Sequence, residues 1–345
     1  MNRKSFVRSA FSLGLGMNSL FSAKREDLLT MPDDPDGLIR IPPYLKKGDL
    51  VGITSPAGYL GLDEVQPAAR KLEEWGFKVR IGKAVGKRDF CFGGTDQERK
   101  DDFQEMLDDA NVKTILCARG GYGSVRIVDQ LDFTAFIRHP KWVIGFSDIT
   151  LLHSHIHRHC KVATLHSKMC NSFPQDWSLA DAVQQDSIEK IRQCLTGEKM
   201  DYWIEAHPLN RQGKAEGVLV GGNLKTLESI SGSQSDLQTA HRILFLEDTG
   251  EYLYSLDRMF RNLLRSNKLS GLSGLVIGGF KVKPDDPGEE FGRTLEQIVM
   301  EVAAGFGFPV CFNAPTGHQK NNFPLKCGVR HRLEVQADRV RLFEV

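Results

Sequence analysis

The sequence has no long apolar run. A helix that crosses a bilayer needs about 20 consecutive apolar residues, and no stretch of the 345 residues comes close to that length. Neither sign of charge is in surplus, because 45 Lys and Arg are balanced by 44 Asp and Glu. Without a basic block, neither a nucleic-acid partner nor binding to an anionic membrane surface is expected.

Paired cysteines and metal motifs are also missing. The seven cysteines are scattered without a C-x-x-C pair, which argues against a disulfide framework and a zinc knuckle. Histidines alternate from His153 to His159, but on a helix only residues four apart share a face, and no acid completes a site. The H-E-x-x-H motif is absent. We therefore expect a helix with polar histidines, no metal and no cofactor.

The N-terminal segment differs in kind from the rest of the chain. The first eight residues carry three cations and no acid, and a mildly apolar run follows up to Phe21. The order Arg3-Lys4-x-Phe6-Val7 resembles a twin-arginine signal in which one arginine is lysine. We expect residues 1–23 to be an export signal that directs the protein to the periplasm, with a disordered or helical tail on a cytoplasmic protein as the alternative.

The remaining chain alternates between short apolar runs and helical patterns, and 345 residues favour two domains. Strands are predicted at 50–54, 78–81, 112–118 and 143–146, with helices at 63–75, after the capping box at Thr95, and at 125–131. This alternation predicts an α/β fold with an N-terminal doubly wound parallel sheet, flavodoxin- or amidotransferase-like. A second, smaller α/β domain follows, with the active site between the two. The expected order is a linker at 24–45, a nucleophile domain at 46–160, a connection at 161–212 and a C-terminal domain at 213–345.

One serine lies where a nucleophile would be exposed. The apolar run Trp142–Phe146 predicts a strand that stops at Ser147, and a helical pattern begins at Asp148. A serine between a strand and a helix sits on a sharp turn, and the helix start behind it offers free N–H groups to an oxyanion. Residue 149 is Ile, so the G-x-S-x-G motif of ordinary α/β-hydrolases is absent.

Two further polar residues follow predicted strands in the second half. Glu247 ends the run from Arg242, and His318 lies in a loop after the run ending at Phe312. Their roles beside Ser147 would be imidazole orienter and general base. The spacing alone also suits a capping serine, a solvated glutamate and an incidental histidine. Asp248 is a competing acid.

Six segments in register resemble the LD-carboxypeptidase family. This serine peptidase group includes muramoyl-tetrapeptide carboxypeptidases and the microcin C immunity peptidases. The resemblance covers nearly all of the chain from Leu50 onward. It is carried by Ser55-Pro-Ala, Arg119-Gly-Gly-Tyr-Gly123, Gly145-Phe-Ser-Asp-Ile-Thr150, Gly221-Gly-Asn-Leu224, Leu246-Glu-Asp248 and Pro315-Thr-Gly-His318.

The resemblance implies a two-domain enzyme with its site in the cleft between the domains. It gives the nucleophile role to Ser147, the acid role to Glu247 and the base role to His318, with no metal and often a homodimer. The reaction implied is removal of the terminal D-alanine from murein tetrapeptides during peptidoglycan turnover. An immunity-type activity on an aminoacyl-nucleotide amide is the alternative, for which Trp177 is a candidate to stack a base. A non-catalytic murein-peptide binding module is the alternative of another class.

We expect two groups of residues around this triad. The oxyanion would meet the backbone N–H of Asp148 and one from Gly120 or Gly121, where glycine lets the backbone approach the substrate. Arg119 is the candidate cation for the substrate carboxylate, with a structural ion pair as the alternative. Tyr122 and Asn223 are the other expected substrate contacts.

Overall fold

The computed structural model describes residues 39–345. The predicted export signal and most of the predicted linker lie outside this range. The described part of the linker lies against the first sheet's lobe: the backbone of Arg40 bonds to Lys161 and Ala163, and Leu45 is 4% exposed. Within 39–345 no helix has the length and apolarity to cross a membrane.

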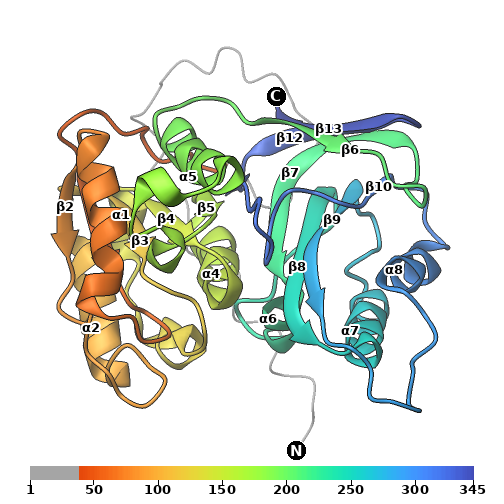
Figure 1. The fold of residues 1–345 in the computed structure, drawn as a ribbon, viewed down its shortest axis with the longest axis horizontal. Coiled ribbons are helices and arrows are strands. Elements are labelled where there is room, and N and C mark those ends of the chain that lie inside the picture. The colour runs from red at the N-terminus through yellow and green to blue at the C-terminus, as the bar shows by residue number, and fades with distance from the viewer. Residues whose placement is uncertain (1–38) are drawn as a thin grey trace, which may run out of the picture. The chain divides into compact units, whose positions relative to one another are not determined.

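Two sheets lie side by side in Figure 1. The first has six strands in the order β11-β5-β4-β3-β1-β2, and the second has seven in the order β10-β9-β8-β7-β12-β13-β6. The first comprises β1 (Leu50–Thr54), β2 (Lys78–Ile81), β3 (Val112–Cys117), β4 (Trp142–Gly145), β5 (Thr164–His166) and β11 (Leu325–Cys327). The second comprises β6 (Asp201–Glu205), β7 (Gly213–Asn223), β8 (Arg242–Glu251), β9 (Gly274–Val282), β10 (Val310–Cys311), β12 (Arg330–Val335) and β13 (Arg339–Glu344).

Helices cover both faces of the first sheet, as a doubly wound fold requires. One face packs against α2 (Asp96–Asp108), α3 (Thr134–Arg138) and α4 (Thr150–Cys160). The other packs against α1 (Leu62–Glu74) and α5 (Ala182–Leu195). Strands β1 to β5 are parallel. Strands β1, β3 and β4 are largely buried on both faces, which explains their nearly continuous apolar runs, whereas the edge strand β2 is only partly buried. The predicted fold class is confirmed.

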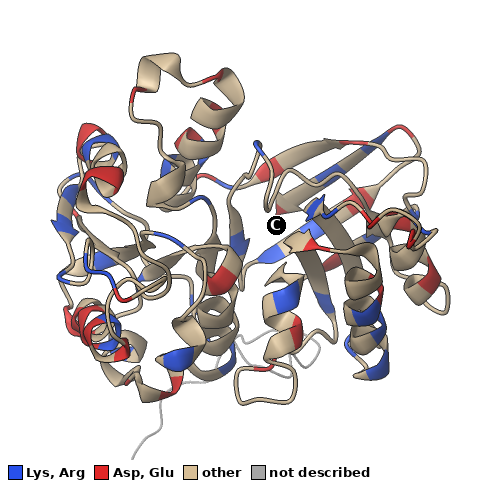
Figure 2. Ribbon diagram, turned by 60° about the horizontal axis from the view of Figure 1, so that its bottom comes forward, with Lys and Arg blue, Asp and Glu red and all other residues tan. Residues whose placement is uncertain are grey.

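The second sheet is mixed. Strands β7 to β10 are parallel, while β12, β13 and β6 add antiparallel pairs. The helices are α6 (Leu224–Ser229), α7 (Leu253–Arg265) and α8 (Leu295–Ala303), and they share a core with one face of β8 and β9. Figure 2 shows Lys and Arg mixed with Asp and Glu over both lobes, as the balanced composition predicts.

Most of the helices and strands predicted from the sequence are present in the structure, and one predicted helix is not. The pattern from Val125 to Leu131 predicts an α-helix, but the structure has two 3-10 turns, Ser124–Arg126 and Val128–Gln130. The β-branched residues of this short run are poor helix formers. The first turn is instead anchored by tertiary bonds, because Asp148 Oδ2 accepts from the Ser124 backbone N–H at 2.9 Å.

Candidate active site

Ser147 occupies a strained turn. It follows β4 and Phe146 and begins a 3-10 helix, Ser147–Ile149, that continues directly into α4. Its φ is +62°, in the left-handed region that a residue with a Cβ rarely adopts. Such strain costs on the order of 1–3 kcal/mol and persists where packing enforces it, commonly at functional sites. The strand–turn–helix predicted from the sequence is thus present at this serine.

The glycine turn after β3 lies directly against this serine. A Cβ added to Gly120 would lie 3.0 Å from Ser147 Cβ and 3.3 Å from its Oγ. Gly121 has φ +89° and is exposed beside it. Asp148 joins the two loops, because its Oδ2 and carbonyl bond to Ser124 N and Oγ at 2.9 and 3.0 Å. Burial raises the pKa of the Asp148 carboxyl. The three predicted oxyanion-hole residues therefore lie together at Ser147.

Glu247 and His318 form an acid–imidazole pair in the second lobe. Glu247 lies on β8 and is fully buried, and its Oε2 lies 2.5 Å from His318 Nδ1. Gly317 makes this approach possible, because a Cβ there would lie 2.3 Å from Glu247 Cβ. Asn322 Oδ1 holds the turn by accepting from the Gly317 backbone N–H at 2.8 Å. An acceptor at Nδ1 leaves Nε2 as the nitrogen that can take a proton.

Phe146 contacts both parts of the candidate triad, because it precedes Ser147 in the chain and packs against His318. Its ring centroid lies 4.9 Å from that of His318, so the base of the second lobe neighbours the residue that precedes Ser147. Within residues 39–345 no hydrogen bond joins Ser147 Oγ to the imidazole. Catalytic hydrogen bonds are often long before substrate binds, so this separation is compatible with a Ser–His couple.

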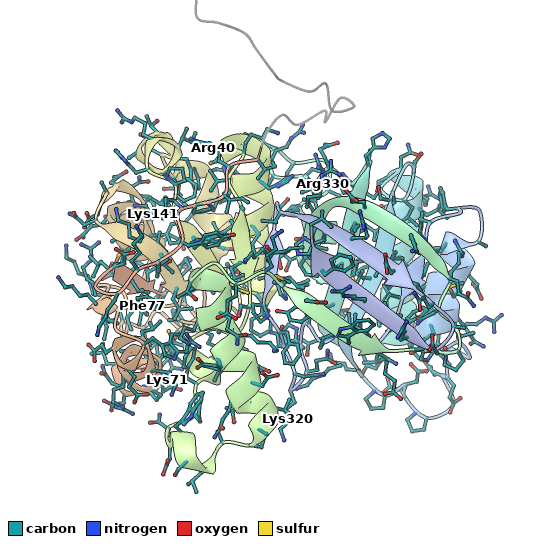
Figure 3. All side chains as sticks on the ribbon, turned by 90° about the horizontal axis from the view of Figure 1, so that it is seen from above. Arg40, Lys71, Phe77, Lys141, Lys320 and Arg330 are labelled. Carbon is teal, nitrogen blue, oxygen red and sulfur yellow. The ribbon has the colours of Figure 1, made fainter. Side chains whose placement is uncertain are left out.

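The segment that carries His318 is anchored to the first lobe. Lys320 Nζ lies 2.8 Å from Asp181 Oδ2, the side chain that caps α5. Figure 3 marks Lys320 beside this helix. In addition, β11 follows the segment and pairs with β5 of the first sheet. These contacts fix the histidine loop across the two lobes.

Asp248, the competing acid, forms its hydrogen bonds with residues other than His318. Its carboxylate accepts from Asn223 Nδ2 at 3.1 Å, Lys225 N at 2.8 Å and Thr249 N at 2.7 Å. Burial first, and then the neighbouring Glu247, raise the pKa of Asp248 to about 6. Asp248 holds the turn between β7 and α6, while Glu247 contacts the imidazole.

A pocket of about 350 Å³ opens beside Ser147 between the two lobes. The first lobe contributes Gly121, Tyr122, Val125, Ser147, Asp148 and Leu151, and the second contributes Asn223, Lys225, Thr226, Ser229, Asp248, Thr249 and Glu251. Ligand pockets commonly have volumes of about 300–1,000 Å³. His318 and Glu247 are not among the residues of this wall.

Of the three expected substrate contacts, Tyr122 and Asn223 line this pocket and Arg119 does not. Tyr122 lines the pocket with 54% of its surface exposed. Asn223 lines it too, but its Oδ1 caps α6 by accepting from Thr226 N at 3.0 Å, and its backbone N–H donates to Thr150 Oγ1 at 3.0 Å. Arg119 is exposed, donates to the Tyr59 carbonyl at 3.3 Å and does not line this pocket.

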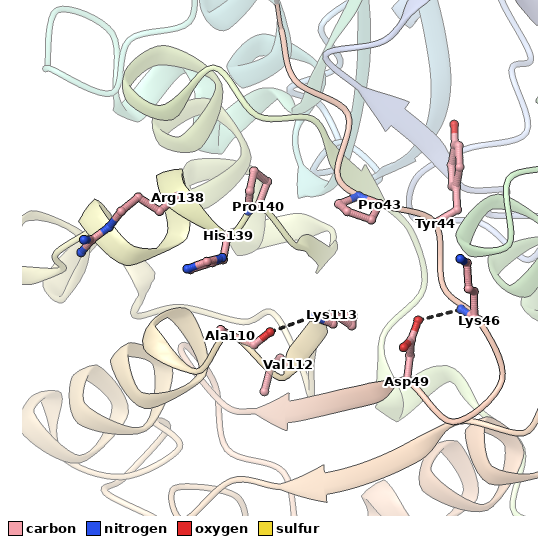
Figure 4. Close-up of a pocket in the computed structure, with 10 residues that line it drawn as sticks. All are labelled: Pro43, Tyr44, Lys46, Asp49, Ala110, Val112, Lys113, Arg138, His139 and Pro140. Carbon is pink, nitrogen blue, oxygen red and sulfur yellow. Dashed lines mark hydrogen bonds between the residues drawn. The ribbon is translucent and has the colours of Figure 1, made fainter.

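Other candidates for chemistry lie elsewhere. The pocket in Figure 4, about 390 Å³, lies at the opposite ends of β1, β3 and β4, near Asp49, Lys113 and Pro140, far along these strands from Ser147. Trp177 lies under the Lys71 ammonium, 3.6 Å from its ring centroid. In the described range no three His, Cys, Asp or Glu side chains group as metal ligands do.

Lys225, Glu251 and Phe146 are site residues that the sequence reasoning missed. Lys225 lies two residues after β7 and Glu251 is the last residue of β8, and charged residues at such positions most often belong to the solvated surface. The only available signal was their place at the carboxyl ends of β7 and β8, where parallel sheets collect function. The sequence pattern predicts Phe146 only as the last residue of a strand.

Comparisons with known proteins show which family the chain resembles over most of its length. Residues 51–167 match the LD-carboxypeptidase N-terminal domain, and residues 216–333 match the LD-carboxypeptidase C-terminal domain. A probable murein peptide carboxypeptidase of Bacillus subtilis is 35% identical over 84% of this chain and 90% of its own. The murein tetrapeptide carboxypeptidase of Pseudomonas aeruginosa is 31% identical over 79% of this chain and 89% of its own.

Two further proteins are similar to this chain over most of its length at lower identity. The microcin C7 self-immunity protein of Escherichia coli is 26% identical over 87% of this chain and 94% of its own. The crystal structure of muramoyltetrapeptide carboxypeptidase from Oxalobacter formigenes superposes with a TM-score of 0.76 at 26% identity, covering 86% of this chain and 98% of that one. Both family domains match in order, and the chain therefore belongs to the LD-carboxypeptidase family of serine carboxypeptidases.

Proposed function

We propose that the protein removes the terminal D-alanine from murein tetrapeptides, in peptidoglycan recycling, through a Ser147–His318–Glu247 triad. The observation that carries this proposal is the 2.5 Å contact of Glu247 with His318 Nδ1 next to the strained Ser147 turn. Two relatives named as murein peptide carboxypeptidases support the substrate class.

The reaction starts at the carbonyl carbon between the L-centre of the diamino acid and D-alanine. Ser147 Oγ attacks this carbon while His318 Nε2 takes the hydroxyl proton, and Glu247 accepts the Nδ1–H of the imidazolium. The oxyanion accepts hydrogen bonds from the Asp148 N–H and from an N–H of the Gly120–Gly121 turn. Each such donor lowers the barrier by about 3 kcal/mol.

Collapse of the tetrahedral intermediate breaks the C–N bond. His318 gives its proton to the departing amine, D-alanine leaves, and the tripeptide remains as an ester on Ser147. Water then attacks the ester with His318 as base, and the proton returns to Ser147 Oγ. One water is consumed, and the products are D-alanine and the tripeptide.

The test is conversion of a tetrapeptide to a tripeptide, followed by mass spectrometry. Ser147→Ala and His318→Ala should each abolish the loss of one alanine and leave the thermal unfolding curve unchanged. Full activity in either folded variant contradicts the triad. Labelling of Ser147 by an active-site serine reagent excludes the non-catalytic binding module. EDTA should have no effect, and a loss restored by zinc would favour a metallopeptidase.

A second activity is favoured by the similarity to the microcin C7 self-immunity protein. It would be cleavage of an aminoacyl-nucleotide amide by the same triad. Trp177, the candidate base-stacking residue, has one ring face occupied by Lys71 and lies outside the Ser147 pocket, which weakens this alternative. Measuring kcat/KM for a murein tetrapeptide and an aminoacyl-nucleotide analogue side by side separates the two.

Export to the periplasm and homodimer formation are part of this proposal. They rest on the signal-like residues 1–23 and on the family resemblance, respectively. Replacing Arg3 and Lys4 by glutamine should retain the protein in the cytoplasm, as fractionation would reveal. Sedimentation of the purified chain gives its oligomeric state.

A further inference from the structure

Arg99 is a fully buried cation beside the loops that surround Ser147. It lies on α2, and it is not among the residues that line the pocket at Ser147. A guanidinium keeps its charge in a protein interior, so it is stabilised there only by acceptors that surround it. The groups that accept its hydrogen bonds therefore show what this side chain holds in place.

The Arg99 guanidinium joins three separate segments. Its Nη1 donates to the carbonyl oxygens of Pro56 at 2.6 Å and Gly123 at 2.9 Å. Its Nε donates to the Gly94 carbonyl at 3.3 Å, and its Nη2 pairs with Asp96. Pro56 follows β1, Gly94 lies between β2 and α2, and Gly123 follows β3. These three strands are neighbours in the first sheet, so Arg99 connects loops at its carboxyl edge.

The loop that contains Pro56 fixes one peptide group of the glycine turn. The Gly58 backbone N–H donates to the Gly120 carbonyl oxygen at 2.8 Å. In a planar trans peptide the carbonyl and the following N–H point in opposite directions, so this bond turns the Gly121 N–H away from Gly58. There is no room for a side chain between the two loops, because a Cβ at Gly58 would lie 2.6 Å from the Gly120 oxygen.

The other end of the glycine turn is anchored as well. The Gly123 carbonyl bonds to Arg99, and the next backbone N–H, that of Ser124, donates to Asp148 Oδ2 at 2.9 Å. A Cβ at Gly123 would lie 2.8 Å from Arg99 Nη1, so the guanidinium occupies the space directly beside the turn. Arg99 therefore supports the turn at this end and, through Pro56, at the other.

We infer that Arg99 is a positioning residue for the reaction at Ser147: it holds the loops on both sides of Gly121, so that the Gly121 N–H stays directed at the oxyanion. It acts through the backbone and touches no reacting atom. A donor that is already in place lowers the barrier because nothing has to reorganise as the charge develops. Lysine cannot replace this residue, since its donors diverge from one nitrogen, whereas the acceptors here surround a planar fork. This inference rests on the proposed nucleophile and not on the identity of the peptide that is cleaved.

The first measurement is steady-state kinetics of Arg99→Lys on the tetrapeptide. The kcat should fall about 10²-fold, as expected for a displaced oxyanion donor, while KM changes by less than about 3-fold, because the oxyanion forms only after the substrate binds. Arg211→Lys is the matched control. Arg211 also donates to three carbonyls, those of Ala303, Phe306 and Phe308 in the second lobe, and its variant should keep the wild-type kcat.

A comparison of two ligands distinguishes positioning from general damage. The aldehyde of the product tripeptide forms a tetrahedral adduct with a serine nucleophile, whereas the tripeptide itself does not. Arg99→Lys should weaken the aldehyde about 10²-fold and leave the affinity for the tripeptide unchanged, since only the adduct carries an oxyanion. Equal weakening of both ligands would mean that Arg99 has a purely structural role.

A third readout does not depend on the peptide. An organophosphonate that labels active-site serines places its phosphonyl oxygen where the oxyanion would lie, so Arg99→Lys should slow the labelling of Ser147 about 10-fold or more. Asp96→Asn is a milder variant, because this partner of Arg99 has a 35% exposed side chain, and it should slow labelling to a smaller extent. Thermal unfolding shows whether each variant is folded, and the result for Asp96→Asn decides if Arg99→Lys is not.

The outcomes separate this inference from the proposed function. A folded Arg99→Lys protein with the wild-type kcat and labelling rate overturns the role of Arg99. If wild-type Ser147 is labelled but no tetrapeptide is cleaved, the proposed substrate is wrong, and the labelling rates alone decide the role of Arg99. If wild-type Ser147 is not labelled, the nucleophile is wrong and the inference fails with it.

Discussion

The ring of Phe146 lies 4.9 Å from the imidazole of His318, and this contact joins the residue before the nucleophile to the candidate base. Phe146 also packs edge-on against the buried His166, with centroids 5.9 Å apart. The same aromatic side chain therefore borders both the histidine loop of the second lobe and the carboxyl end of β5. We expect this ring to limit how closely the base can approach Ser147.

Replacing Phe146 by alanine should lower kcat by about 10²-fold, because a displacement of 1 Å in a catalytic group costs about that much. Steady-state kinetics on the tetrapeptide measures the effect. Phe90→Ala is the control, since that phenylalanine is 86% exposed and should leave kcat unchanged. An unchanged kcat in Phe146→Ala would mean that the loop around Gly317 holds the imidazole without help.

Glu247→Gln should lower kcat about 10⁴-fold at neutral pH, as loss of the orienting acid does in other serine peptidases. The buried amide would present a donor or a weaker acceptor to His318 Nδ1, and the imidazole would lose its useful tautomer. Asp248→Asn is the matched comparison. Because Asp248 contacts Asn223 and Lys225 instead of the imidazole, its variant should keep far more activity. A larger loss in Asp248→Asn would assign the acid role to Asp248.

The order of the elements was predictable from the sequence because it depends on local patterns. Burial on both faces produces apolar runs at β1, β3 and β8, and each is followed by a polar loop. Ser147 and Glu247 were identifiable as candidates because function collects after such strands.

Pairings over long sequence separations were not predictable. Strand β11 has three residues, Leu325-Lys326-Cys327, with a lysine in the middle, yet it joins β5 of the first sheet. Strand β6 lies in the segment predicted as a connection, but it pairs with β13 and forms an edge of the second sheet. Nothing local distinguishes a buried lysine with a distant partner from an exposed one. The charges of Lys225 and Glu251 in the pocket wall have the same ambiguity.

Gly120→Ala should lower kcat at least 10-fold with little change in the free energy of unfolding. The new Cβ would lie 3.0 Å from Ser147 Cβ and 3.2 Å from the Phe146 carbonyl oxygen, so the nucleophile or the oxyanion donors must shift. Gly305→Ala is the control, because a Cβ there meets nothing within 4 Å. Kinetics together with urea unfolding of both variants gives the comparison. Wild-type kcat in Gly120→Ala would show that the turn adjusts without cost to the chemistry.

Acid should destabilise the fold through His153. Burial lowers the pKa of this histidine from 6.5 to about 4, and its Nε2 lies 2.9 Å from the Gly145 carbonyl oxygen. The unfolded chain binds a proton at His153 more readily than the folded protein does. The contribution of neutral His153 to the free energy of unfolding is therefore fully present above pH 6.5 and is lost as the pH falls toward 4. His153→Gln retains a donor for Gly145 and removes the titration. Urea unfolding between pH 7 and 5 should show a slope reduced by up to about 1.4 kcal/mol per pH unit. An unchanged slope would contradict this assignment.

A buried ion pair joins the edge strand of the first sheet to the last strand of the second. Lys326 Nζ lies 2.8 Å from Glu344 Oε1, with side chains 0% and 4% exposed, and it also donates to the Glu198 carbonyl at 2.8 Å. Glu344 in turn accepts from the Met200 backbone N–H at 2.9 Å. Each charge is thus compensated only while the other is present.

Removing either Lys326 or Glu344 alone should lower the free energy of unfolding substantially. Lys326→Met leaves the Glu344 carboxylate buried without its cation, which typically destabilises a protein by about 3–5 kcal/mol. The double variant Lys326→Met/Glu344→Gln should recover much of that loss, since no unpaired charge remains. Arg330→Met, which breaks an exposed pair with Glu216, should cost less than about 1 kcal/mol. Urea unfolding of the three proteins tests this, and a single variant as stable as the double one would show that water reaches Glu344.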